Sequence, residues 1–145
     1  NGDMDLYLKE SNNIWGKVTY TGKIDKTQVY KFYKMADVGI LPSFSEQCSY
    51  VAIEMMMFGL PIVGTTSTGL SEMIEEGVTG YKVKIEKTET ELILPEKTLA
   101  KKTIQMLNNP NIQEIRRKSR QRFVNNYSIN EMREKLLNTI TIKYQ

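Results

Sequence analysis

Short apolar segments rich in β-branched residues alternate with helical segments along the chain. Strands are expected at 17–22, 37–43, 61–66 and 80–85. Helices are expected at 26–36, 48–58, 69–76, 95–107 and 111–126, and from 130 onward. Nearly continuous apolar strands that alternate with helices are typical of a parallel sheet covered on both faces. The pattern therefore predicts an α/β fold with a Rossmann-like parallel sheet and helices on both faces.

Two segments carry further local signals. Gly59 and Pro61 of the sequence "FGLP" are expected to close the helix at 48–58, because glycine often follows a helix and proline cannot continue one. Residues 86–97, "EKTETELILPEK", are expected to form a polar loop without evident chemistry.

The most apolar helix contains a single charge. Segment 48–58 carries only Glu54, and Glu46 stands before its start. Burial of a carboxylate without a partner costs several kcal/mol. Two sugar hydroxyls would be a suitable partner, since an ionised carboxylate only accepts hydrogen bonds. The spacing of the two glutamates alone favours the alternative, in which Glu54 pairs with a lysine or caps backbone amides.

Two loops are expected at the carboxyl ends of the strands, where ligands bind in open α/β sheets. In "PSFSEQCS" (42–49) the amides of residues 47–50 would start a helix unpaired, which suits a phosphate. In "TTSTGLSE" (65–72) Thr68 is the expected N-cap and Gly69 would permit close approach of an anion. Two neighbouring helix starts would fit a diphosphate.

Composition limits the chemistry. The 145 residues, 40% of them hydrophobic, suffice for one domain. No apolar run is long enough to span a membrane. The absence of histidine excludes a Ser-His-Asp triad, a Cys-His pair and a histidine-ligated zinc site within the chain. The single cysteine, Cys48, excludes an internal disulfide and favours a reducing cytoplasm.

The net charge of +3 is concentrated in "EIRRKSRQR" (114–122). Such a run usually forms the solvated face of a surface helix. Only Phe123 lies near it, so the interleaved aromatic residues of a nucleic-acid site are missing and no nucleic-acid partner is predicted. Contact with anionic lipid or with a negatively charged acceptor stays open.

An ordered set of residues gives the strongest signal. The pattern "Y..ADVGILPS.SE.......E....G.PIV.T...G..E.I..G.TGY.V" starts at Tyr33 and resembles the C-terminal half of glycosyltransferase family 4, the retaining GT-B enzymes. The pairs Gly2–Asp3 and Tyr127–Ser128 fit flanking family positions, so the resemblance covers nearly the whole chain. It implies a hexosyltransferase-like enzyme of bacterial polysaccharide biosynthesis.

The resemblance also implies roles for matching residues. Glu54 would hold the ribose hydroxyls of a nucleotide-sugar donor of UDP or GDP type, and Glu46, the candidate catalytic residue, would face the donor sugar. The other implied donor-binding residues are Ser43, Gln47, Cys48, Ser49, Gly22, Lys23 and Ile24. Backbone groups of 47–49 would hold the diphosphate and segment 22–24 would border the base. The reaction would resemble a front-side displacement that needs neither histidine, metal nor cofactor.

The chain departs from the family pattern in the first loop. Gln47, Cys48 and Ser49 replace the usual Gly-Phe-Gly, which leaves less room for a phosphate. Cys48 at a helix start could resemble a nucleophile. No base is expected near it, so inert packing is the favoured interpretation.

By the resemblance, residues 1–145 form one donor-binding fragment, with a core at about 1–94 and C-terminal helices at about 95–145. The N-terminal acceptor domain, two strands and a basic pair would precede residue 1. We therefore expect an N-terminally truncated sheet and an inactive fragment that either joins strands 17–22 and 37–43 or self-associates. The enzyme would be cytoplasmic, with peripheral contact at the inner face of the membrane left open.

Two alternatives stand beside this interpretation. The fragment could be a nucleotide-sugar-binding module without catalysis. Asp3-Met4-Asp5 matches D-x-D, the metal motif of the other nucleotide-sugar transferase fold, but no strand precedes it.

Overall fold

The structure is a computed structural model that describes residues 17–143, with side chains described to residue 140. It contains two compact units, the first ending at Tyr30 and the second beginning at Lys31. The boundary falls inside helix α2 (Lys26–Met35). The Asp3–Asp5 motif and the Gly2–Asp3 pair lie outside the described residues.

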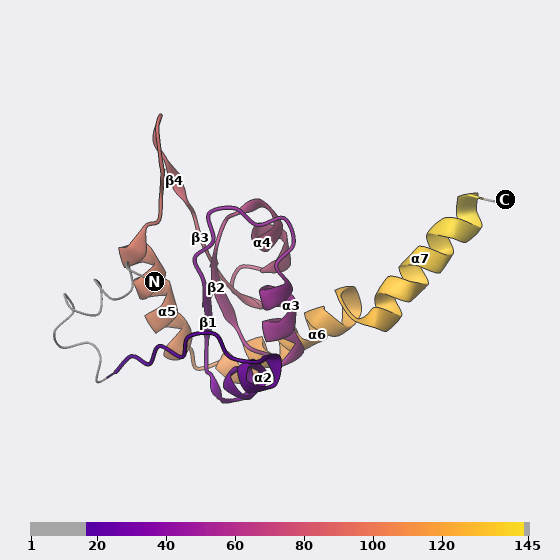
Figure 1. The fold of residues 1–145 in the computed structure, drawn as a ribbon, viewed down its shortest axis with the longest axis horizontal. Helices are drawn as coiled ribbons and strands as arrows, with labels where there is room; N and C mark the ends of the chain where they lie inside the picture. The colour runs from indigo at the N-terminus through magenta and orange to yellow at the C-terminus, as the bar shows by residue number, and fades with distance from the viewer. Residues whose placement is uncertain (1–16, 144–145) are drawn as a thin grey trace. The chain divides into compact units, whose positions relative to one another are not determined.

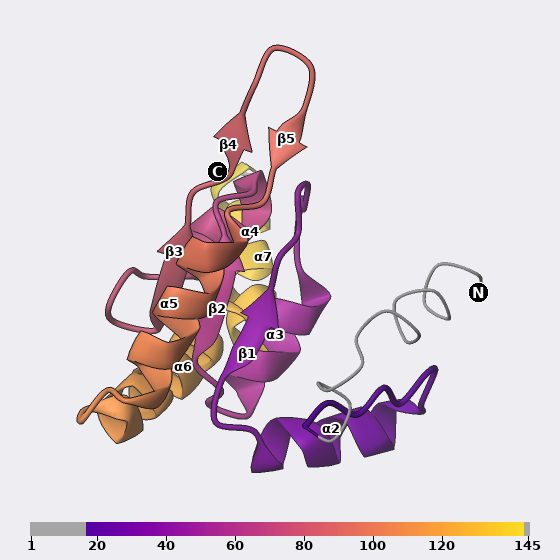
Figure 2. The same cartoon turned by 90° about the vertical axis from the view of Figure 1, so that its left-hand side faces the viewer.

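The second unit is built on a three-stranded parallel sheet in the order β1-β2-β3 (Figures 1 and 2). Its strands are β1 (Gly39–Leu41), β2 (Ile62–Thr65) and β3 (Gly80–Val83). In register, Ile62 of β2 pairs with Gly39 on one side and Gly80 on the other. Every residue of β2 is buried, as expected for a strand covered on both faces. These strands confirm three of the four predicted ones.

Helices cover both faces of the sheet, which confirms the predicted fold class. The helices of the second unit are α3 (Tyr50–Met57), α4 (Thr68–Met73), α5 (Glu96–Leu107), α6 (Ile112–Asn126) and α7 (Ile129–Lys143). In Figure 1, α5 lies on one side of the sheet and α3 and α4 lie on the other. On the α5 side, Val63, Tyr81 and Val83 pack with Met106 and Ile115 in one buried cluster.

Helix α3 ends as the sequence predicts. Gly59 has a φ of 67°, in the left-handed region that glycine tolerates. The Gly59 amide donates to the Met56 carbonyl and the Leu60 amide to the Met55 carbonyl, both at 2.9 Å. These two bonds form a Schellman motif, so the last carbonyls of α3 are satisfied before Pro61 enters β2.

The predicted strand at 17–22 is wrong. These residues form no ladder with any residue between 17 and 143, and Val18 and Tyr20 are 44% and 62% exposed. A β-branched alternating segment becomes a strand only when a neighbour accepts its backbone hydrogen bonds and covers its apolar face.

The predicted loop at 86–97 is also wrong, because part of it is an antiparallel hairpin. Strand β4 (Glu86–Lys87) pairs with β5 (Leu92–Ile93). The Thr88 hydroxyl donates to the Glu91 carbonyl at 3.2 Å and accepts from the Glu91 amide at 3.0 Å. Thr88 therefore closes the turn with its side chain, a device that threonine shares with other turn residues.

Helix α2 begins at a side-chain cap formed by Asp25 and Gln28 in the first unit. The Gln28 amide donates to Asp25 Oδ1 at 3.0 Å, and the Asp25 amide donates to Gln28 Oε1 at 3.4 Å. This reciprocal pair is a capping box. The Thr27 hydroxyl, which donates to the Asp25 carboxylate, and the Gln28 amide together lower the pKa of Asp25 below its usual 3.8.

The basic run on α6 is more than the solvated face that the sequence predicts. Three of its arginines bind backbone carbonyls at the C-terminal ends of other helices. Arg116 donates to the Ala36 carbonyl at 3.0 Å after α2, Arg120 to the Met57 carbonyl at the end of α3, and Arg122 to the Met73 carbonyl at 2.7 Å at the end of α4. Cations at these positions satisfy orphan carbonyls and complement the helix dipoles. Arg117 instead pairs with Glu114 on the exposed surface, as predicted.

Candidate functional site

The start of α3 lies at the carboxyl end of β1, where the sequence places the first binding loop. Ser49 is the N-cap: its hydroxyl accepts from the Ala52 amide at 3.2 Å, and the residue is 4% exposed. No hydrogen-bond acceptor within residues 17–143 faces the backbone amides of Gln47, Cys48, Ser49 or Tyr50. The predicted unpaired amides are therefore present: those of Ser49 and Tyr50 at the N-terminus of α3, and those of Gln47 and Cys48 in the loop before it.

The second loop differs from its prediction. The N-cap of α4 is Ser67, and Thr68 instead donates through its hydroxyl to the Glu46 carbonyl at 3.2 Å. The Gly69 amide donates to the same carbonyl at 2.6 Å. A Cβ atom on Gly69 would lie 1.9 Å from the Gln47 carbonyl oxygen. Gly69 thus permits close approach of the first loop's backbone, and its amide is already used. The expectation that Gly69 admits an anion is wrong.

Threonines at the end of β2 tie the strand ends together. Thr65 is fully buried, and its hydroxyl donates to the Ser43 carbonyl. The Thr66 amide donates to the Val83 carbonyl at 2.9 Å, and the Thr66 hydroxyl accepts from the Ile85 amide at 3.3 Å. These contacts fix the loops that follow β1, β2 and β3 against one another. Thr65 is not among the predicted site residues, although a hydroxyl at the end of a buried strand is the signal that could have found it.

The two predicted carboxylates belong to the loop before α3 and to α3 itself. Glu54 is half-buried on α3 and takes part in an interaction within the structure. Glu46 is half-buried, and its carboxylate has no hydrogen-bond or ion-pair partner among residues 17–140. The backbone of Glu46 is held firmly by Thr68 and Gly69 while its side chain stays available to a ligand.

The structure places the other predicted residues as follows. Gln47 and Cys48 are exposed, and Ser43, four residues before Gln47, is half-buried. Exposure of the Cys48 thiol contradicts the predicted inert packing. Gly22, Lys23 and Ile24 belong to the first unit, where Gly22 has a φ of 63° and Ile24 is half-buried. The structure brings together residues 43–54 of the second unit.

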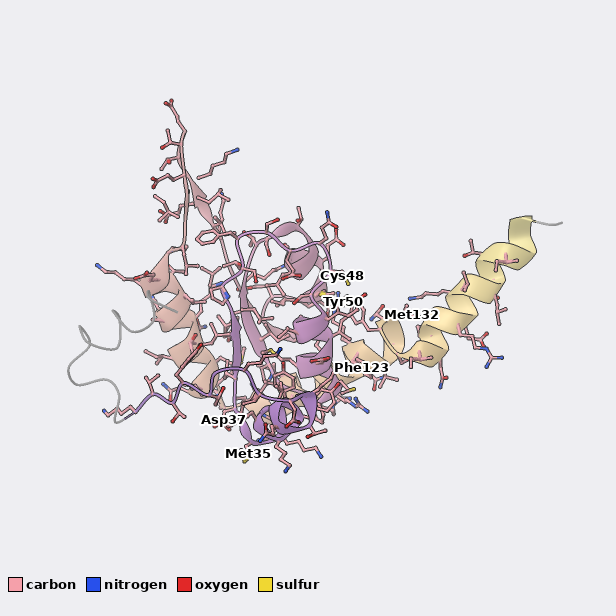
Figure 3. The ribbon with its side chains drawn as sticks, viewed as in Figure 1. Met35, Asp37, Cys48, Tyr50, Phe123 and Met132 are labelled. Carbon is pink, nitrogen blue, oxygen red and sulfur yellow. The ribbon has the colours of Figure 1, made fainter. Side chains whose placement is uncertain are left out.

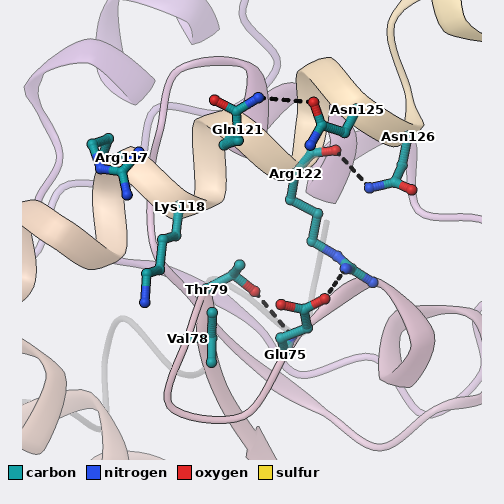
Figure 4. A pocket seen from close by; sticks show the side chains of 9 residues that line it. All are labelled: Glu75, Val78, Thr79, Arg117, Lys118, Gln121, Arg122, Asn125 and Asn126. Atoms are coloured by element: carbon teal, nitrogen blue, oxygen red, sulfur yellow. Dashed lines mark hydrogen bonds and ion pairs between the residues drawn. The ribbon is translucent and has the colours of Figure 1, made fainter.

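A separate hollow of about 210 Å³ lies between α6 and the loop before β3 (Figure 4). Its side chains are largely engaged with one another: Arg122 pairs with Glu75, and Gln121 donates to Asn125 at 2.8 Å. None of the predicted site residues lines it. The candidate site is therefore an open edge of the sheet, distinct from this hollow.

Among the described residues, no three Cys, Asp or Glu side chains lie close enough together to hold a metal ion. Between residues 17 and 143 no helix combines the length and the apolar character needed to cross a membrane.

Ser49 and Ser67, the N-cap residues of α3 and α4, allow the contribution of each cap to stability to be tested. The Ser67 hydroxyl is buried and has no partner within the described residues, and the Ser49 hydroxyl is satisfied. Ser67→Ala is expected to raise the free energy of unfolding by about 1 kcal/mol, because it removes an unsatisfied buried group. Ser49→Ala should lower it by about 1 kcal/mol by removing a cap. Urea unfolding measures both, and a loss of stability in Ser67→Ala would contradict this account.

Comparison with known proteins gives a consistent result. The family of glycosyl transferases group 1 matches residues 1–109 of the chain. An uncharacterized glycosyltransferase of Methanocaldococcus jannaschii is 36% identical over 85 residues, covering 57% of this chain and 22% of that protein. The chain thus spans about a fifth of that relative's length.

Solved structures share the fold at lower identity. Sucrose-phosphate synthase from Thermosynechococcus elongatus has a TM-score of 0.76 at 22% identity, covering 97% of this chain and 34% of that one. The Anabaena protein HepE, solved in complex with UDP, has a TM-score of 0.70 at 17% identity, covering 97% of this chain and 38% of that one. At these identities the likeness supports the α/β fold alone.

Proposed function

Since the chain belongs to the glycosyl transferases group 1 family and has the fold of the C-terminal half of a GT-B enzyme, we propose that it is the nucleotide-sugar-binding half of a retaining glycosyltransferase. The proposed reaction moves a hexose-type sugar from a nucleoside diphosphate to a glycan or lipid-linked acceptor. The proposed donor is of UDP or GDP type, and no metal ion or cofactor takes part.

One observation carries this proposal: the unpaired amides of residues 47–50 at the start of α3. A helix N-terminus of this kind carries about half a positive charge and presents several donors to one anion. The loop that carries these amides is anchored through the Glu46 carbonyl to Thr68 and Gly69. The amides are therefore held in place before a diphosphate arrives.

The chemistry proposed for this site is electrostatic. In a front-side displacement the bond from the sugar to the diphosphate breaks while the acceptor oxygen attacks from the same face. Negative charge grows on the departing diphosphate, which also accepts the acceptor's proton. Fixed amides aimed at that charge stabilise the transition state, and loss of one such donor typically costs about 100-fold or more in rate. Glu46 would face the sugar, and Glu54 would accept hydrogen bonds from the ribose hydroxyls.

Several features of the whole enzyme belong to the same proposal. The relatives are much longer than this chain, so we assign acceptor binding to another domain and expect no transfer by residues 1–145 alone. A cytoplasmic enzyme with peripheral membrane contact, self-association of residues 1–145 and a role in bacterial polysaccharide biosynthesis remain part of the proposal. HepE, a structural neighbour, was solved with UDP, which makes UDP the first donor nucleotide to test.

Substitution of the two carboxylates, Glu54 and Glu46, tests this proposal. Glu54→Gln should weaken binding of UDP by about 10- to 100-fold, since a ribose hydroxyl bond to a charged acceptor is lost. Glu46→Gln should leave UDP binding unchanged and reduce sugar transfer in the enzyme that contains this chain. Calorimetry with UDP and a transfer assay measure the two effects.

Glu89→Gln, on the exposed turn of the β4–β5 hairpin, is the matched control and should change neither quantity. Equal loss of UDP affinity in Glu54→Gln and Glu46→Gln would overturn the assignment of the two roles.

A further inference from the structure

Tyr50 is the first residue of α3 and is 76% exposed. Its ring contacts no other ring or cation among residues 17–140, and its hydroxyl has no hydrogen-bond partner there. A single exposed aromatic residue is ordinary on a protein surface. What distinguishes Tyr50 is its position at the start of α3, next to the unpaired amides of the candidate site.

Tyr50 and Glu54 lie on the same face of α3. Residues four apart in a helix are neighbours, with Cβ atoms about 5–6 Å apart. The Cα–Cβ bond also tilts toward the helix N-terminus, so the Tyr50 side chain leans toward the unpaired amides of 47–50. Figure 3 shows Cys48 and Tyr50 beside each other at the start of α3. The Tyr50 ring is therefore placed beside the unpaired amides, on the helix face that also carries Glu54.

We infer that the Tyr50 ring stacks on the nucleoside of the bound nucleotide sugar. This inference rests on the proposed function, in which the diphosphate occupies the amides and the ribose reaches Glu54. A ligand that spans these two points passes the ring. Every base has a π-face that an aromatic side chain can cover, and alanine substitution of such a stacking residue typically weakens binding about 5- to 150-fold. Tyr50 is thus a positioning residue for the nucleoside.

The proposed role of the Tyr50 ring can be distinguished from the roles of the backbone amides and of Val51. The diphosphate is recognised by backbone amides, which no side-chain substitution at position 50 removes. Val51, the next residue, is 42% exposed but points about 100° away around the helix. Val51→Ala is therefore a matched control that removes apolar surface from the same turn without touching the proposed contact.

The test is calorimetry of the protein with two probes, UDP and inorganic pyrophosphate. Tyr50→Ala should bind UDP about 10-fold more weakly than the unsubstituted protein, and Tyr50→Phe should bind it nearly as well, because the ring is kept. Binding of pyrophosphate should be the same in all three proteins. Val51→Ala should match the unsubstituted protein with both probes, and circular dichroism verifies that each variant is folded.

Any other result of these binding measurements would contradict either the stacking contact or the proposed function. Unchanged UDP affinity in Tyr50→Ala, or a loss of the same size in Val51→Ala, overturns the stacking contact. Equal losses for UDP and pyrophosphate show that Tyr50 acts on the helix start, which also overturns it. If the unsubstituted protein binds neither UDP nor GDP, the proposed function itself is overturned and the inference falls with it.

Discussion

Gly69→Ala is expected to lower the free energy of unfolding by about 3 kcal/mol or more and to abolish measurable UDP binding. The added Cβ would lie 1.9 Å from the Gln47 carbonyl oxygen and 2.8 Å from the Glu46 carbonyl oxygen. Both are backbone atoms, so no flexible side chain can move aside. Relief of the clash must displace the loop whose amides start α3, or separate it from α4. Urea unfolding and calorimetry with UDP measure the two effects.

Gly77→Ala is the matched control for this substitution. Gly77 has a φ of 72°, and nothing lies within 4 Å of a Cβ built there. An alanine would be strained by its backbone conformation alone, at a cost of about 1 kcal/mol, and UDP binding should persist. If Gly69→Ala were as stable as Gly77→Ala and still bound UDP, the contact between the two loops would not position the site.

Arg122→Met is expected to destabilise the protein by about 3 kcal/mol, because three hydrogen bonds of one guanidinium are lost together. Arg122 donates from Nε to the Met73 carbonyl at 2.7 Å, from Nη2 to the Glu72 carbonyl at 2.6 Å, and from Nη1 to the Glu75 carboxylate. Its side chain is 19% exposed, so water replaces these partners poorly. The carbonyls at the end of α4 would be left unsatisfied. Thermal and urea unfolding measure the loss.

Arg117→Met on the same helix is the control. Arg117 is exposed, and among the residues that the structure describes it pairs only with Glu114, three residues earlier. Surface pairs of this spacing contribute about 0.5 kcal/mol or less. A similar loss of stability in both variants would mean that net charge, and not the helix-end contacts of Arg122, stabilises the protein. Arg122→Lys should fall between the two, since one ammonium cannot replace a fork of donors.

Local sequence signals predicted much of the second unit because they act through neighbours in the chain. The amides of Gly59 and Leu60 end α3 through bonds that reach back three and five residues, and Pro61 cannot continue the helix. The strands at 39–41, 62–65 and 80–83 follow from continuous apolar runs, which a sheet buried on both faces requires. The amides of Ser49 and Tyr50 are unpaired because any helix leaves its first amides without intrahelical acceptors.

Predictions from the sequence were wrong where the structure of a segment depends on a partner far away in the chain. Residues 17–22 have the composition of a strand and no ladder partner among the described residues. The 86–97 segment looked like a loop because two-residue strands are too short to show a period of two. The arginines of α6 looked solvated because their acceptors are backbone carbonyls 49 to 80 residues away in sequence.

By itself the sequence determined the α/β class, the order of the main helices and strands, and the membership in the glycosyl transferases group 1 family. Those properties follow from hydrophobic period, helix-end chemistry and the ordered glutamates and glycines. The tertiary structure alone decided that Gly69 makes room for the Gln47 backbone, that Thr65 and Thr66 tie three strand ends together, and that Arg122 caps α4. These are contacts between segments far apart in the chain, and packing, not local preference, selects which atoms meet.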